Sequence, residues 1–280
     1  MEMSEQRTHE LPGGWLPPVA PERKPPWWRR FGGGLVAALI FAAAKLKAIL
    51  VLLPKIKVLT TSGSMLVSVA AYSLIWGWKF AVGFVVLLFV HEMGHVIALR
   101  REGVQASAPL FIPFLGALVW AKSLGGNALA EARVGLAGPI LGTIGAAACL
   151  PVAWLTGADM WTALAFTGFL LNLFNLLPVT PLDGGRAMAA LAPWMWFVGL
   201  GAVVALAFAF PNPIILIIAV VGAFDVYGRW TRRRRGGDEA RAYYKVRGRD
   251  RALVGFVYLA LIALLVLGMD ATHLERSIPD

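Results

Sequence analysis

The residues whose types and spacing point most directly to chemistry are His91, Glu92 and His95, which form the pattern H-E-x-x-H. Positions i and i+4 lie on one face of an α-helix, so His91 and His95 can offer two imidazole nitrogens to a single metal ion. Glu92 projects about 100° away from His91 around the helix, which suits contact with a water molecule beside the metal. The pattern therefore predicts a metal site on a helix.

The motif lies within a strongly apolar stretch that runs from Phe84 to Leu99. Ionisable side chains inside a membrane helix are costly and normally mark a transport pathway or a functional site. Two other interpretations remain open at this point. The histidines could be core residues that hydrogen-bond to their neighbours, or they could form a proton relay with Glu92.

A catalytic zinc site needs three protein ligands and one open position, so a third ligand is required. Cys149 lies in an Ala-, Leu- and Gly-rich run, where a small buried hydrophobic role is expected. His9 and His273 lie in the two tails of the chain. Asp183 is the better candidate, because the predicted membrane layout brings it to the depth of His91 and His95.

The sequence around Asp183 predicts a broken helix end. Pro178 and Pro181 interrupt the apolar segment before it, and Gly184 and Gly185 give the backbone freedom after it. Such backbone is tolerated at membrane depth where it faces a protein interior. Asp183 could instead pair with Arg186 or cap the next helix.

The composition predicts the scaffold. The chain has 280 residues, of which 58% are hydrophobic and 15% charged. A soluble domain has about 25% charged residues, and a disordered chain would carry far fewer apolar ones. The single cysteine excludes a disulfide framework. We therefore expect an all-α polytopic membrane protein whose spans are all helices.

About seven apolar segments are long enough to cross a bilayer. If residue 60 lies in the cytoplasm, only Lys79 and Arg276 of the 26 basic residues fall on the outer side. The net charge of +10 then favours contact with anionic lipid, and no nucleic-acid partner is expected. We expect a bacterial inner membrane, with the site toward the cytoplasm. The expected spans are 64–79, 81–99, 133–155, 160–178, 194–211, 213–229 and 252–269.

The segment 102–132 is apolar but is interrupted by prolines and glycines. A re-entrant element beside the site, with a short hairpin strand in 115–122, is one interpretation, and a surface loop is the other. The expected organisation has five parts: a disordered cytoplasmic tail (1–34), an interfacial amphipathic helix or extra span (35–60), a catalytic membrane domain (61–230), a basic cytoplasmic segment (231–251), and a last membrane helix with a short tail (252–280).

Over residues 81–190 the chain resembles the site-2 protease family of intramembrane zinc metalloproteases. The resemblance rests on the H-E-x-x-H motif, on the Gly-Pro segment at Leu136–Pro139, and on N-x-x-P-x-x-x-x-D-G, which begins at Asn175 and contains Asp183. It implies a zinc ion bound by His91, His95 and Asp183, with Glu92 as general base. It also implies that Asn175 lies near the scissile carbonyl, and that 104–128 resembles the re-entrant loop of the family.

The function that this resemblance implies is hydrolysis of peptide bonds within or near transmembrane segments of membrane protein substrates. Two alternatives come from other functional classes. An ion- or proton-coupled transporter would use the intramembrane His and Glu as its pathway. A catalytically idle relative would bind membrane partners without cleaving them.

Overall fold

The structure is a computed structural model that describes residues 57–114, 116–119, 121 and 126–273. All of these residues fall within one compact unit of the chain, Lys55–Asp280. The predicted tail 1–34 lies outside the described residues. The same holds for all but the last few residues of segment 35–60, where an interfacial helix or an extra span is expected.

The described residues are mostly helical, which confirms the predicted all-α class. Two short strands, β1 (Leu110–Ile112) and β2 (Gly116–Leu118), interrupt the helices. In chain order the helices are α2 (Lys57–Trp76), α3 (Trp78–Arg101), α4 (Ala128–Thr156), α5 (Asp159–Asn175), α6 (Asp183–Leu191), α7 (Met195–Ala209), α8 (Pro213–Arg235), α9 (Gly237–Tyr243) and α10 (Gly248–Ala271).

Four of the described helices, α3, α4, α8 and α10, are long and apolar enough to cross a membrane. They fall on four of the seven expected spans and support an integral membrane protein. The other three expected spans fall on α2, α5 and α7, which have 20, 17 and 15 residues respectively. The basic run that begins at Arg232 forms the last turn of α8.

Local sequence signals set several helix boundaries. Asn127 caps α4 with its side-chain oxygen, which accepts a hydrogen bond from the Ala130 N–H, and α4 ends at Gly157 with a φ of 64°. Asn212 caps α8 in the same way by accepting from the Ile214 N–H. Gly77, with a φ of 79°, separates α2 from α3, because few other residues adopt that backbone conformation.

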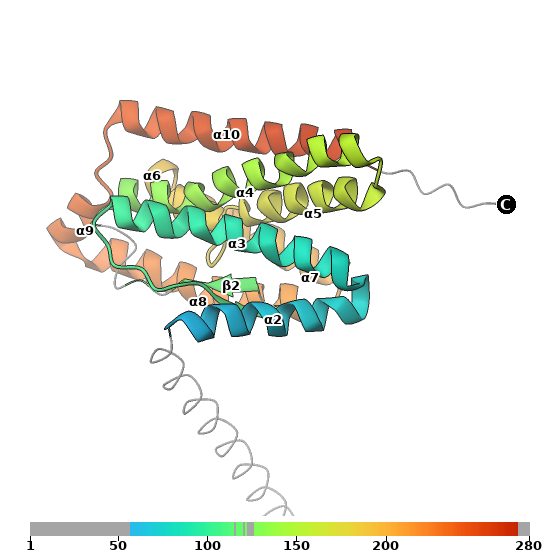
Figure 1. Ribbon diagram of the computed structural model, residues 1–280. Helices are drawn as coiled ribbons and strands as arrows, with labels where there is room; N and C mark the ends of the chain where they lie inside the picture. The colour runs from blue at the N-terminus through green and yellow to red at the C-terminus, as the bar shows by residue number, and fades with distance from the viewer. Residues whose placement is uncertain (1–56, 115, 120, 122–125, 274–280) are drawn as a thin grey trace, which may run out of the picture. The chain divides into compact units, whose positions relative to one another are not determined.

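Helices α3, α4 and α5 pack against one another, with α10 against α4 and α5 (Figure 1). Glycine permits the closest approach of α3 to α4: a Cβ atom added at Gly94 would overlap the backbone of Ala137. Small residues at helix contacts are a common way of packing membrane helices. The tight contact brings α4 directly against the face of α3 that carries His91 and His95.

The two strands form an antiparallel hairpin in which Phe111 lies opposite Ala117. Helix α2 holds the first strand and the turn. The Phe111 N–H donates to the Ser64 hydroxyl (3.1 Å), and the Phe114 N–H donates to the Tyr72 hydroxyl (3.0 Å). Strand β2 lies within the segment 115–122, where a hairpin strand is expected, whereas no strand was predicted at the residues of β1.

Candidate metal centre

The structure brings together the three residues that were predicted as metal ligands. The Nε2 atoms of His91 and His95 are 3.2 Å apart on one face of α3. The Oδ2 atom of Asp183, the first residue of α6, lies 3.1 Å from the first nitrogen and 3.2 Å from the second. All three residues are buried, with exposed fractions of 2%, 5% and 6%. Three potential ligand atoms therefore converge in the protein interior.

A tight loop places Asp183 at this position. Helix α5 ends at Asn175, and residues 176–182 fold back before α6 begins. A Cβ atom added at Gly184 would overlap the Leu176 carbonyl, and one added at Gly185 would overlap the Thr180 amide. Both glycines lie within α6, so the chain uses them for space rather than for an unusual backbone conformation.

Hydrogen bonds fix the tautomer of each imidazole. His95 Nδ1 lies 2.8 Å from the Val134 carbonyl, which can only accept, so this nitrogen carries the proton. His91 Nδ1 lies 2.8 Å from Asn172 Oδ1. The Asn172 amide nitrogen donates to the Gly168 carbonyl (2.7 Å), which orients its oxygen toward His91. Both Nε2 atoms of the neutral imidazoles are therefore acceptors.

This arrangement fits a metal ion. The two Nε2 atoms and the Asp183 Oδ2 atom lie 3.1–3.2 Å from one another. When both imidazoles are neutral, none of these three atoms carries a proton that could form a hydrogen bond to another. A zinc ion about 2.0–2.1 Å from three tetrahedral ligands would separate those ligand atoms by roughly 3.3–3.4 Å. The two nitrogens and the oxygen are ligand types that zinc prefers. A carbonyl or amide behind each imidazole is typical of histidines that bind metals.

The second carboxylate oxygen of Asp183 faces Arg186, whose guanidinium lies 3.7 Å away. The ionised carboxylate is the form in which Asp183 would bind a cation. Of the two predicted alternatives for Asp183, the pairing with Arg186 coexists with this geometry. The capping role is not found, because the N-cap of α6 is Leu182 and no side chain caps this helix start.

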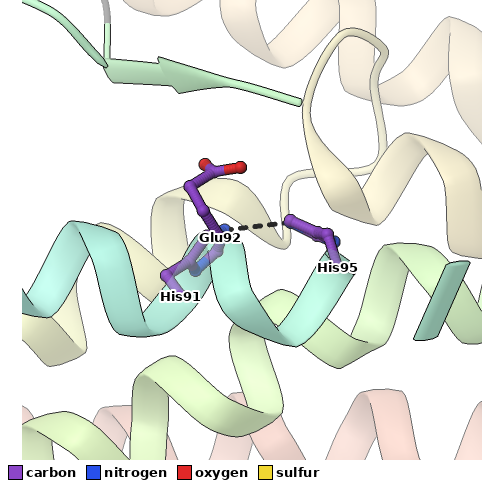
Figure 2. Close-up of side chains that lie close together, drawn as sticks. All are labelled: His91, Glu92 and His95. Carbon is purple, nitrogen blue, oxygen red and sulfur yellow. Dashed lines mark hydrogen bonds between the residues drawn. The ribbon is translucent and has the colours of Figure 1, made fainter. Parts of the chain in front are cut away.

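Glu92 lies beside the histidines on α3 (Figure 2). Potential ligand atoms of His91, Glu92 and His95 all lie within 4.8 Å of one another. Glu92 is half-buried, and its side chain makes no hydrogen bond or ion pair with any other residue in the described part of the chain. A carboxylate in this position is close enough to act on a molecule bound at the site.

Asn172 is a site residue that the sequence reasoning missed. The family resemblance implies a role for Asn175, which the structure places, half-buried, at the last residue of α5. Asn172 lies one helical turn earlier and contacts His91. The signal was present, because two asparagines three residues apart in an apolar helix share one face.

Glycines on α4 leave room for the site. A Cβ atom added at Gly138 would overlap the Nε2 atoms of both His91 and His95. One added at Gly142 would overlap the side chain of Asn172. The Gly-Pro segment of the sequence therefore lies directly against the predicted ligands.

Comparison with known proteins identifies a family that part of this chain resembles. Residues 79–158 match the model of Peptidase family M50, which confirms the predicted resemblance to the site-2 protease family. The zinc metalloprotease MJ0392 of Methanocaldococcus jannaschii is 30% identical over 129 residues, which are 44% of this chain and 37% of the relative. Rip3 of Mycobacterium tuberculosis is 33% identical over 144 residues, 46% of this chain and 35% of the relative. The chain thus spans little more than a third of the length of these relatives.

We predict that Gly138→Ala lowers zinc binding, because the added methyl group would occupy the space beside both Nε2 atoms. Alanine favours a helix more than glycine does, so the loss would not reflect helix propensity. We expect the zinc content of the purified protein, measured by mass spectrometry, to fall to less than about half. Gly201→Ala is the control, since a Cβ atom at Gly201 meets nothing within 4 Å. Equal zinc contents in the two variants would contradict the close contact.

Proposed function

We propose that this protein is an intramembrane zinc metalloprotease that hydrolyses peptide bonds within or near transmembrane segments of its substrates. The observation that carries the proposal is the convergence of His91, His95 and Asp183, beside Glu92, on an apolar helix. The match of residues 79–158 to Peptidase family M50 supports the same reaction class.

Each residue of the site has a proposed role. The Nε2 atoms of His91 and His95 and one carboxylate oxygen of Asp183 would hold the zinc ion. When bound, zinc supplies a Lewis acid that lowers the pKa of water and stabilises negative charge on oxygen. Glu92 takes the proton of the attacking water and delivers it to the leaving nitrogen. Asn175 contributes an amide near the scissile carbonyl oxygen.

The proposed membrane arrangement has about seven helices. Helices α2, α5 and α7 would join the four long apolar helices, and the β1–β2 hairpin would be re-entrant. Arg100 and Arg101 end the helix that carries the histidines, and Arg232–Arg235 end α8. Because basic residues concentrate on the cytoplasmic side, this pattern favours a site near the cytoplasmic face of a bacterial inner membrane. Residues 61–230 would form the catalytic domain and 231–251 a basic cytoplasmic segment.

The proposed substrates are membrane proteins with one span that can unwind locally, because an intact helix shields its own peptide bonds. An unwound segment could pair with the hairpin. The Phe111 N–H donates to the Ser64 hydroxyl rather than to β2. Phe111 and Ala117 are therefore a non-hydrogen-bonded pair of the antiparallel ladder, in which the N–H and carbonyl of each residue point away from the other strand. Ala117 therefore offers an N–H and a carbonyl on the edge of β2 that faces away from β1. Neither the composition nor the site favours a nucleic-acid partner.

We predict that Glu92→Gln gives a folded, zinc-loaded and inactive protein, because the amide cannot take up a proton from water. The expected loss of cleavage of a model transmembrane substrate is at least about a hundredfold. Zinc content and the thermal unfolding midpoint should match those of the wild type. Full cleavage by this variant would remove the general base from the proposed mechanism.

We predict that Asp183→Ala lowers the affinity for zinc by more than about 100-fold. Substituting a residue that only hydrogen-bonds to a metal ligand typically lowers the affinity 10- to 100-fold, and the loss of a ligand should cost more. The measurement is a competition titration against a zinc chelator. Asp238→Ala is the matched control, because Asp238 has a fully solvated side chain on α9, 98% exposed. An affinity for zinc that is the same in both variants would exclude Asp183 as a ligand.

We predict that Ala117→Pro lowers kcat/KM for a transmembrane substrate by about tenfold, since proline removes the N–H that the β2 edge offers. Zinc content should not change. Ala117→Val is the control, because valine keeps the N–H and favours a strand. If the two variants cleave the substrate equally well, β2 is not the strand that the substrate joins.

A further inference from the structure

The described residues contain a second buried polar cluster, which the proposed mechanism does not use. Its centre is Arg229 on α8, whose guanidinium donates to Glu131 on α4 (2.6 Å) and to Asp225 on α8 (2.5 Å). Tyr243 donates its hydroxyl to the other oxygen of Glu131 (2.6 Å). Glu131 is 1% exposed, and the Arg229 side chain is 12% exposed.

General energetics do not require this cluster to act through overall stability. Removing charges from water costs several kcal/mol per ion, and the attraction between partners roughly offsets that cost. Well-packed apolar residues often replace such an ion pair without loss of stability. Arg229 is nevertheless bonded to two acids at once through separate nitrogens, an arrangement that fixes the direction of its planar guanidinium.

Two series of side-chain contacts connect Arg229 to the residues around Asp183. The first runs through Asp225, which accepts a hydrogen bond from the Thr180 hydroxyl. Thr180 is buried in the loop that precedes α6, three residues before Asp183. Arg229 therefore fixes the acceptor that holds this loop.

The second series runs through Trp196, which is fully buried. The Arg229 guanidinium carbon lies 5.4 Å from the centre of the Trp196 ring, within the range of a cation–π contact. The indole N–H donates to the Gly185 carbonyl (2.7 Å), two residues after Asp183. The two series of contacts thus end on residues on both sides of the predicted ligand: on the Thr180 side chain before it and on the Gly185 backbone after it.

We propose that Arg229 is a positioning residue of the metal centre: with Glu131 and Asp225 it holds the 176–182 loop and the first turn of α6 so that Asp183 faces the two imidazoles. The inference rests on the proposed function only in assuming that the three ligands bind a metal. The contacts that carry it do not involve any of these ligands directly. A substitution at Arg229 should therefore move Asp183 while leaving His91 and His95 in place.

The test compares variants of the full chain in detergent by their affinity for zinc and by the visible spectrum of bound Co²⁺, which reports the ligand set. Arg229→Met alone leaves the buried Glu131 and the half-buried Asp225 without their cation. A charge-balanced triple variant, Arg229→Met with Glu131→Gln and Asp225→Asn, therefore protects the fold. We expect zinc affinity 10- to 100-fold weaker and an altered Co²⁺ spectrum. The unfolding midpoint of the metal-free protein should stay within a few degrees of the wild type.

Two further variants sharpen the result. Arg229→Lys keeps the positive charge but loses the planar group whose separate nitrogens donate to Glu131 and Asp225. We therefore expect a smaller loss of zinc affinity than in the triple variant, with the same change in the Co²⁺ spectrum. The control is Arg133→Met with Glu102→Gln, which removes an ion pair of 3.3 Å between α4 and the residue that follows α3. This pair is more exposed and has no contact with the 176–182 loop among the described residues, so zinc affinity should not change.

Unchanged zinc affinity and spectrum in both Arg229 variants, with or without a lower unfolding midpoint, would overturn the proposal and leave the cluster a purely structural role. A wild-type protein that binds neither zinc nor Co²⁺ would overturn it as well. If the wild type binds metal through Asp183 but cleaves no peptide, the protease proposal fails. The positioning role of Arg229 would then still be decided by the affinity measurement.

Discussion

The structure depends on one electrostatic constraint: three acceptor atoms, two from imidazoles and one from a carboxylate, meet within 3.2 Å in a buried site. Neutral imidazoles whose protons are committed to Asn172 and Val134 have no hydrogen to share among them. A divalent cation bound by all three atoms would remove the repulsion among them, whereas a single added proton would relieve that repulsion only in part.

Each neighbouring element meets one requirement of this site. Helix α3 provides two imidazoles one turn apart, and α4 comes close enough through Gly138 to supply the Val134 carbonyl. Helix α5 supplies Asn172 and then ends, so that the chain can turn and present Asp183 from a new helix start. A carboxylate at the first turn of α6 is also favoured by the helix dipole. Helices α7 and α8 pack on the turn and reach it through polar contacts at Trp196 and Asp225.

Sequence alone predicted the parts of the site that depend on local spacing. The i, i+4 positions of His91 and His95 require a shared face, and the prolines before Asp183 require the helix to end. It did not reveal Val134, Asn172 or the Glu131–Arg229 pair, because these contacts join residues 39, 81 and 98 positions apart. Such contacts depend on which helices are neighbours in the fold. The local sequences of apolar helices with similar compositions do not specify their neighbours. The glycines at 184 and 185 were identified for backbone freedom, whereas the structure uses them for close packing.

One ion would therefore lie between two imidazoles of helix α3 and the first residue of helix α6. The most direct measurement is X-ray absorption at the zinc edge on the purified full-length protein. The account predicts two imidazole nitrogens and carboxylate or water oxygen in a four-coordinate shell at about 2.0–2.1 Å, with no sulfur. A shell that lacks imidazole scattering, or that contains a sulfur at about 2.3 Å, would contradict it.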